Sequence, residues 1–323
     1  MSLLQRLRID PFLLAIITAA GAASLLPAGG ALIPVLDWAT KIAIGALFFL
    51  YGVRLHPKQA LEGLRHWRLH TTILTFTYVA FPLVGLALGG LVPNVISPAL
   101  YPGLLYLCLV PSTVQSSIAF TSVARGNVAG AIVSASFSNL IGVAVTPLLT
   151  IALMRTAGGG GIDPSSIWDV VLQLLVPFVL GQLSRRWTAG FVTRHPKLKL
   201  FDQGSIVLVV YAAFSAGVRE GIWTMLSGRD LLVLIGACLA LLALMLWATW
   251  AAAKALRFNR EDRIAIQFCG TKKSLASGLP MATVLFAGQP IGLIMLPLMV
   301  FHQAQLMACG YLAGRYARQA ERP

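Results

Sequence analysis

Charged residues are scarce in this sequence. Only 11% of its 323 residues are Asp, Glu, Lys or Arg, and 11 acidic residues stand against 25 basic ones. Soluble proteins carry about 25% charged residues, whereas 57% of this chain is hydrophobic and its mean hydropathy is +0.80. The low charge argues against a soluble domain, and apolar runs without alternation argue against a β-barrel. The sequence predicts an all-α polytopic membrane protein.

Cysteines and catalytic motifs are also sparse. The four cysteines, Cys108, Cys238, Cys269 and Cys309, fall within apolar runs and lack the paired spacing of metal ligands, so we expect buried, inert thiols. The sequence contains no H-E-x-x-H, no G-x-S-x-G and no intramembrane pair of aspartates, which would indicate hydrolytic sites. We therefore expect neither an enzyme nor a cofactor.

Ten long apolar runs are present, each near the roughly 20 residues that cross a bilayer as a helix. They cover residues 12–30, 34–53, 70–91, 97–122, 128–154, 166–184, 204–223, 230–252, 263–286 and 290–314. The first run resembles a secretory signal, but its removal would reverse the charge bias described next. We expect an uncleaved first helix.

Basic residues gather on one side of the predicted membrane. With a cytoplasmic N-terminus, only Arg155, Arg219 and Arg229 fall in outer loops, whereas nineteen Lys and Arg residues fall in inner ones. This asymmetry follows the positive-inside rule, so the net charge of +14 reflects topology and attraction to anionic lipid. The basic residues are dispersed, and nucleic-acid binding is not expected. We predict a multi-pass protein of the bacterial inner (plasma) membrane with both termini cytoplasmic.

The ten spans divide into two sets of five, within residues 1–155 and 163–318, which together form one transporter domain. Because five is odd, the second set enters the membrane from the opposite side, which gives an inverted repeat. Polar interruptions fall at matching positions, "VPSTVQSSIA" in the fourth span and "CGTKKS" in the ninth. Paired broken helices of this kind point to a transporter's binding site.

Polar side chains at these interruptions are the candidate substrate or ion ligands, because a broken helix in a membrane needs partners for its freed backbone groups. The alternative for each hydroxyl alone is a helix-packing role. The candidates are Thr113, Gln115, Ser116 and Ser117 in the fourth span, Ser136 and Asn139 in the fifth, Gln267, Thr271, Lys272, Lys273 and Ser274 in the ninth, and His302 and Gln305 in the tenth.

Two adjacent lysines inside a membrane span are the sharpest signal. A lysine at the bilayer centre costs about 2.5–3.5 kcal/mol. Because helix neighbours point about 100° apart, we expect only one of Lys272 and Lys273 to face a polar cavity. That lysine would be a counter-charge for an anion or a substitute for a coupling cation. The alternative is that the span is misplaced and both lysines reach an interface.

The segments "VPSTVQSSIAFTSVARGN", "SASFSNLIGVAVTPLL", "DRIAIQFCGTKKSLASGLPMA" and "FHQ" resemble the bile acid:sodium symporter superfamily, and "FCGTKKSLASGLPMA" is similar to its SBF-like branch. The resemblance implies ten helices in two inverted repeats. It implies a panel of spans 1, 2, 6 and 7 and a core in which broken helices 4 and 9 cross. It further implies an organic-anion substrate in the panel–core cleft near that crossing, moved by alternating access.

The sequence departs from the sodium-coupled relatives at their ion sites. Gln267 stands at the position of their ninth-span glutamate, and Thr271 and Lys272 stand for their following glutamine and asparagine. Ser116 and Ser117 replace a Ser-Asn pair, and Thr77 replaces a third-span glutamine. Since a sodium site needs oxygen ligands, Ser117, Gln267 and Thr271 are the remaining candidates, but an added ammonium opposes cation binding. Sodium coupling is therefore doubtful.

Protons are the other candidate coupling ion. Burial disfavours the charged form of a lysine, so a lysine at the ninth-span break could release a proton, with His302 as a second candidate. The sequence thus favours a secondary transporter of a small organic anion, bile-acid-like or another carboxylate or sulfate. The alternative implied by eukaryotic members of the branch is a non-transporting membrane regulator of calcium homeostasis. The oligomeric state is left open.

Overall fold

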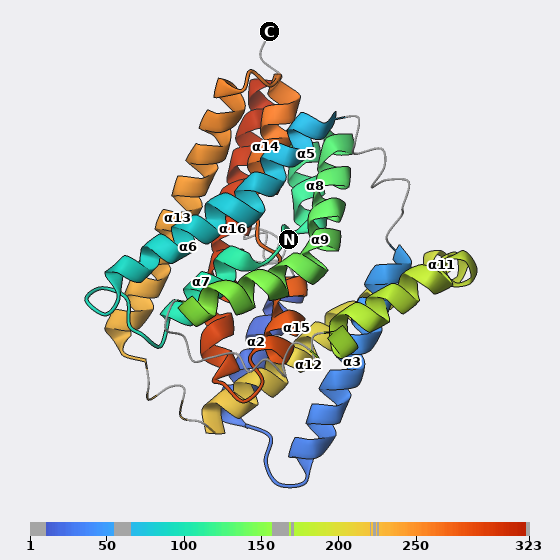
Figure 1. The fold of residues 1–323 in the computed structure, drawn as a ribbon, viewed down its shortest axis with the longest axis vertical. Helices are drawn as coiled ribbons and strands as arrows, with labels where there is room; N and C mark the ends of the chain where they lie inside the picture. The colour runs from blue at the N-terminus through green and yellow to red at the C-terminus, as the bar shows by residue number, and fades with distance from the viewer. Residues whose placement is uncertain are drawn as a thin grey trace, which may run out of the picture. The chain divides into compact units, whose positions relative to one another are not determined.

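The computed structural model describes residues 11–54, 66–156, 168, 171–219, 221, 224 and 226–320, and all regular structure in these ranges is helical (Figure 1). Helical residues occupy every predicted span. Parts of the spans 166–184 and 204–223, and the predicted boundary between the repeats near residues 156–162, lie outside the described residues.

Within the described ranges, six helical segments are long and apolar enough to cross a membrane. They are Leu32–Arg54, Trp67–Leu91, Val128–Met154, Leu200–Arg219, Gly228–Ala255 and Ile291–Gln319. A seventh is the bent pair α7 (Tyr101–Leu109) and α8 (Val114–Val123), whose axes differ by 65°. The prediction of a polytopic helical membrane protein is confirmed, whereas the count of ten spans and the inverted repeat stay predictions.

The other three predicted spans are helical but shorter or divided. The first corresponds to α2 (Pro11–Leu25), which has 15 residues. The sixth corresponds to the π-helical turn η4 (Val171–Leu175) followed by α11 (Val176–Arg194). The ninth is divided into α14 (Arg260–Thr271) and α15 (Leu275–Leu285), as the polar interruption predicted.

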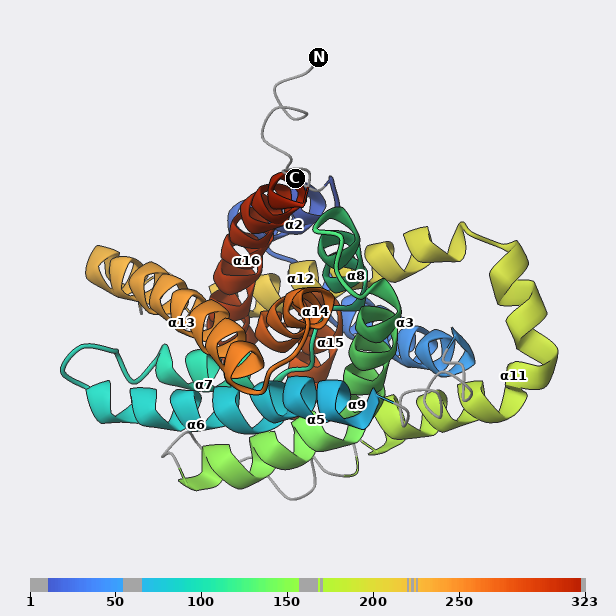
Figure 2. The ribbon, with the colours of Figure 1, turned by 90° about the horizontal axis from the view of Figure 1, so that it is seen from above.

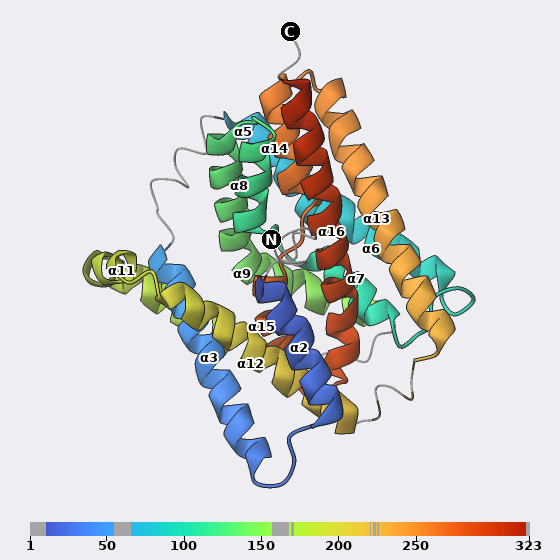
Figure 3. The same cartoon turned by 180° about the vertical axis from the view of Figure 1, so that it is seen from behind.

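The chain forms two compact units. The first unit comprises Met1–Arg54, Asp163–Met225 and Leu279–Leu293. Its closest helix pair is α3 (Leu32–Arg54) with α11, and α12 (Leu198–Arg219) packs on α2 and α3 (Figure 3). An ion pair between Arg54 and Asp202 ties α3 to α12.

The second unit comprises Leu55–Ile162, Leu226–Gly278 and Ile294–Pro323. Its third-span segment runs without a gap through α5 (Trp67–Thr75), the π-helical turn η2 (Phe76–Ala80), α6 (Phe81–Leu88) and the 3-10 turn η3 (Gly89–Leu91). The helices α8, α9 (Val128–Thr156), α13 (Gly228–Ala255) and α5 surround α14, as the view from above shows (Figure 2). α16 (Ile291–Gln319) packs on α14 through Cys309 and Ala313.

Capping residues fix where α13 and α14 begin. The Ser227 hydroxyl accepts from the Asp230 N–H at 3.1 Å, and the Asp230 carboxylate accepts from the Ser227 N–H at 2.9 Å, which is a capping box. Asn259 caps α14 by accepting from the Asp262 N–H at 2.8 Å. The Asp262 carboxylate in turn accepts from Asn127 at 2.7 Å, so the start of α14 is tied to the start of α9. These bonds fix the position of the helix that leads into the lysines.

Candidate functional site

The two helix breaks of the second unit lie against each other. The α7–α8 break spans 110–113 and the α14–α15 break spans 272–274; we call the two together the broken-helix crossing. The Ser274 N–H donates to the Pro111 carbonyl at 2.7 Å, and the Thr113 hydroxyl donates to the Lys273 carbonyl at 2.8 Å. One freed carbonyl of each break therefore accepts a hydrogen bond from the other break, which helps to satisfy backbone groups as a membrane interior requires.

Side chains from two neighbouring helices complete the crossing. From α9, the Asn139 amide donates to the Ser112 carbonyl at 2.6 Å and accepts from the Ser277 hydroxyl at 2.6 Å. From α16, the Gln305 side chain accepts from the Lys273 N–H at 2.9 Å and donates to the Lys273 carbonyl at 2.8 Å. Asn139 and Gln305 thus act as clamps that hold extended backbone in place. Their polar groups are used within the protein.

His302 and Ser274 belong to the same network. The Nδ1 atom of His302 lies 2.8 Å from the Gln305 amide nitrogen and 3.4 Å from the Lys273 carbonyl oxygen. The Ser274 hydroxyl pairs with Ser277 at the start of α15. His302 and Gln305 lie three residues apart on one face of α16, and that face points at the ninth-span break.

The Lys273 ammonium is fully satisfied. Its three N–H donors reach the backbone carbonyl oxygens of Thr77 at 3.0 Å, Cys108 at 2.9 Å and Val110 at 2.9 Å. The face of the Phe81 ring lies 4.1 Å from the nitrogen, which adds a cation–π contact. The side chain is completely buried. Lys273 is thus a link between the third span and both breaks.

The Lys272 ammonium, by contrast, makes no hydrogen bond to the described residues. It is also completely buried. It lies 3.9 Å from the centre of the Phe120 ring on α8, which is a cation–π contact. A buried cation without a hydrogen-bond acceptor is costly. Lys272 is therefore the lysine that can still take an anionic partner.

Unpartnered hydroxyls share the α8 helix with the Phe120 ring. The Ser116, Ser117 and Thr121 hydroxyls are buried and find no oxygen or nitrogen partner in the described part of the chain. Positions 117, 120 and 121 lie on one face of α8, because residues three and four apart are neighbours on a helix. This face and the Lys272 ammonium together present several free donors.

Of the three candidate sodium ligands, Gln267 and Thr271 have partners for their side chains within the protein, as does Thr77. The Gln267 amide donates to the Leu246 carbonyl at 3.0 Å and accepts from the Tyr316 hydroxyl at 2.8 Å. The Thr271 hydroxyl lies 3.2 Å from that of Thr249, and Ser117 is the buried hydroxyl described above. The Thr77 hydroxyl donates within its own helix, to Ile73, while its carbonyl serves Lys273.

The remaining two candidates contribute less to the crossing. Gln115 is exposed on α8, and Ser136 is half-buried on α9. Sequence reasoning did not single out Phe81, Phe120 or Tyr316, which contact Lys273, Lys272 and Gln267 respectively. Only the i+3 spacing of Phe120 from Ser117 could have suggested one of them. All four cysteines are buried, as expected, and none of them forms a disulfide.

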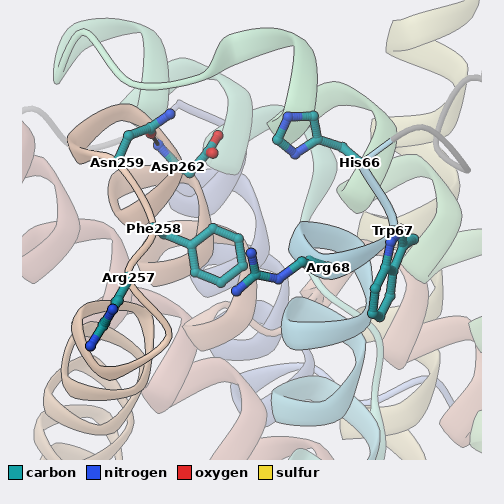
Figure 4. A pocket seen from close by; sticks show the side chains of 7 residues that line it. All are labelled: His66, Trp67, Arg68, Arg257, Phe258, Asn259 and Asp262. Carbon is teal, nitrogen blue, oxygen red and sulfur yellow. Dashed lines mark hydrogen bonds between the residues drawn. The ribbon is translucent and has the colours of Figure 1, made fainter.

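A separate surface pocket of about 350 Å³ lies between the start of α5 and the α13–α14 turn (Figure 4). It is lined by His66, Trp67, Arg68, Arg257, Phe258, Asn259 and Asp262. The Arg68 guanidinium lies over the Phe258 ring at 5.3 Å and donates to the Leu256 carbonyl at 3.0 Å. None of these residues belongs to the broken-helix crossing.

Two discontinuous helices that cross in an apolar helical protein, with buried ammonium groups at the crossing, define the class of membrane transporters built on broken helices. Comparison with known proteins places the chain within that class. The family model described as the SBF-like CPA transporter family matches residues 10–318. The chain belongs to this family.

Three relatives illustrate the similarity. The chain is 50% identical over 313 residues to the protein PA2026 of Pseudomonas aeruginosa, with 97% of this chain and 94% of that one covered. It is 46% identical over 314 residues to "Putative symporter YfeH" of Escherichia coli, with 97% and 94% covered. It is 31% identical over 318 residues to sodium/bile acid cotransporter 7 of Xenopus tropicalis, with 95% and 91% covered. The resemblance to the SBF-like branch is confirmed.

Proposed function

We propose that this protein is a secondary active transporter of a small organic anion, bile-acid-like or another carboxylate or sulfate, that works by alternating access. The proposal is supported by membership of a transporter family and by the names of relatives, which include a symporter and a bile acid cotransporter. The observation that carries it is the buried Lys272 ammonium, which has no acceptor of its own among the described residues.

An anion at Lys272 would satisfy groups that the protein leaves unpaired. Its oxygens would accept from the ammonium and from the hydroxyls of Ser117 and Thr121, which are buried and have no oxygen or nitrogen partner among the described residues. These hydroxyls lie on α8, the helix that also carries the Phe120 ring beside the ammonium. Charge-assisted hydrogen bonds of this kind contribute about 1.5–3 kcal/mol each. Binding the anion therefore removes the cost of an isolated cation.

Sodium coupling finds little support in the geometry. The nitrogen of the Gln267 amide donates to Leu246 and its oxygen accepts from Tyr316, and this glutamine stands where the sodium-coupled relatives have a glutamate. We propose that transport is independent of sodium. A proton carried by Lys272 or His302 remains the coupling candidate.

Counterflow in liposomes tests the function. The purified chain is reconstituted alone into liposomes loaded with an unlabelled anion, and uptake of the same labelled anion is measured for a bile acid, a short carboxylate and sulfate. We expect counterflow with at least one of them, equal in sodium and choline buffers. Lys272→Met should reduce it about 10- to 100-fold, since a lost charge-assisted bond of about 1.5–3 kcal/mol corresponds to that factor.

The control variant is Ser122→Ala, which removes an exposed hydroxyl of the same helix and should leave counterflow unchanged. Absence of counterflow with every anion would contradict the transporter proposal and favour a regulator. Counterflow that Lys272→Met leaves intact would contradict the role of this lysine.

A further inference from the structure

The Lys273 ammonium lies inside a shell of backbone oxygens that resembles an ion-binding site. Three carbonyl oxygens, from Thr77, Cys108 and Val110, lie 2.9–3.0 Å from the nitrogen, and the Phe81 ring lies on it at 4.1 Å. Carbonyl oxygens of interrupted backbone are the ligands that membrane proteins offer to monovalent cations. The shell is completely buried with its lysine.

Each carbonyl is free for a local reason. The Phe81 N–H donates to the Phe76 carbonyl in the π-helical turn, and the next residue, Pro82, has no N–H, so the Thr77 carbonyl lacks its helical donor. The Ser112 N–H, which would serve Cys108 in a continued helix, donates to the Ser138 hydroxyl at 3.1 Å. Val110 is in an extended conformation at the end of α7. Three separate irregularities therefore converge on one point.

We propose that this shell is a monovalent-cation site whose cation is supplied by the chain itself. The Lys273 ammonium acts as a tethered ion that joins the third span, the end of α7 and the α14–α15 break. The protein consequently takes up no soluble cation at this position. The proposal concerns the cation and is independent of which anion the protein carries.

The spacing of the shell suits an ammonium. Bonds of 2.9–3.0 Å have the usual length of N–H···O bonds to carbonyl oxygens, and they are longer than the 2.3–2.6 Å at which oxygen ligands hold Ca²⁺. A soluble substitute for the side chain should therefore be an ammonium ion rather than a small metal ion.

Chemical rescue of a truncated side chain tests the proposal. Lys273→Ala removes the equivalent of propylammonium, and the thermal midpoint of the detergent-purified protein is followed with added ammonium or propylammonium chloride. Sodium chloride, choline chloride and 1-propanol serve as comparisons at matched concentration. We expect a lowered midpoint that rises with the logarithm of ammonium or propylammonium concentration, and less or no response to sodium, choline or propanol.

Lys272→Ala is the matched control, because its ammonium is equally buried but touches no carbonyl among the described residues; ammonium should not raise its midpoint above choline. Wild type should respond alike to sodium, potassium and choline. The proposal is overturned if the thermal midpoint of Lys273→Ala is the same in ammonium and propylammonium as in choline. It is equally overturned if the variant is unfolded in choline and neither ammonium nor propylammonium restores a folded protein. It is also overturned if sodium or potassium specifically stabilises wild type. Unfolding needs no substrate, so a failed counterflow experiment leaves this outcome unaffected.

Discussion

At the scale of single residues, Lys272 and Lys273 are adjacent and identical, but one stabilises the fold and the other is available for function. Both are completely buried at the end of α14, where the negative end of the helix dipole favours a cation. The Lys273 nitrogen has three carbonyl partners, whereas that of Lys272 has none among the described residues. One lysine therefore stabilises the fold, and the other is kept at a cost to stability, which is typical of a functional group.

Methionine substitutions should change the free energy of unfolding in opposite directions at the two lysines. Lys273→Met keeps most of the side-chain volume but leaves three buried carbonyls without their donor, at about 1–3 kcal/mol each, so we expect a loss of about 3 kcal/mol or more in unfolding free energy. Lys272→Met removes a buried charge that has no hydrogen-bond acceptor among the described residues and should raise that free energy by about 1 kcal/mol or more. Denaturant unfolding in detergent measures both. Shifts of the same sign in the two variants would show that the lysines are not distinguished as described.

At the scale of secondary structure, close helix approach depends on glycine. The helices α3 and α11 of the first unit meet at Gly52 and Gly181, where an added Cβ would collide with the carbonyl oxygen of Phe178 or Phe49 on the facing helix. Small residues at such contacts allow backbones to approach in membranes, where van der Waals packing replaces the hydrophobic effect. The pair of glycines therefore sets the distance between these two helices.

Gly181→Ala should be destabilising, because the new methyl group meets backbone that cannot rotate away. We expect a cost of about 2 kcal/mol or more, in the upper part of the range for overpacked sites. Gly190→Ala is the control on the same helix, since nothing lies within 4 Å of its added Cβ, and helix propensity predicts a small gain. Thermal midpoints of the two variants provide the measurement, and equal midpoints would refute the packing account.

At the scale of the whole molecule, charge predicts orientation. The outer loops of the predicted topology hold three basic residues and the inner loops nineteen. The transmembrane potential and the anionic lipids of the inner leaflet therefore favour the orientation with both termini inside. Because the four native cysteines are buried, an introduced surface cysteine can be labelled with little background.

Gly29→Cys and Glu261→Cys test that orientation. Residue 29 lies at the outer end of the first predicted span, beyond the end of α2, and residue 261 lies in a predicted inner loop; both positions are exposed. A membrane-impermeant maleimide applied to intact spheroplasts should label Gly29→Cys and not Glu261→Cys, and it should label both after the membrane is opened. The reverse pattern in intact spheroplasts would invert the topology. The unsubstituted protein is the control for the native thiols.

The sequence by itself determined the membrane class, the positions of both helix breaks and the polar residues gathered there. These features are local, because apolar runs, prolines and adjacent lysines can each be recognised within a short stretch of the sequence. The same local signals pointed to Asn139 and Gln305, which the structure places at the broken-helix crossing. Pro82, in the first turn of α6, is a sequence signal for the π-helical turn that precedes it.

Only the tertiary structure decided which lysine is paired. The acceptors of Lys273 lie 163 to 196 positions away in the chain, and they are backbone carbonyls, which every residue has and no sequence pattern distinguishes. The same holds for Gln267, whose amide is used by Leu246 and Tyr316 from two other helices. Composition shows that charge is present in the membrane, whereas the convergence of freed backbone groups determines where that charge is satisfied and where it stays available.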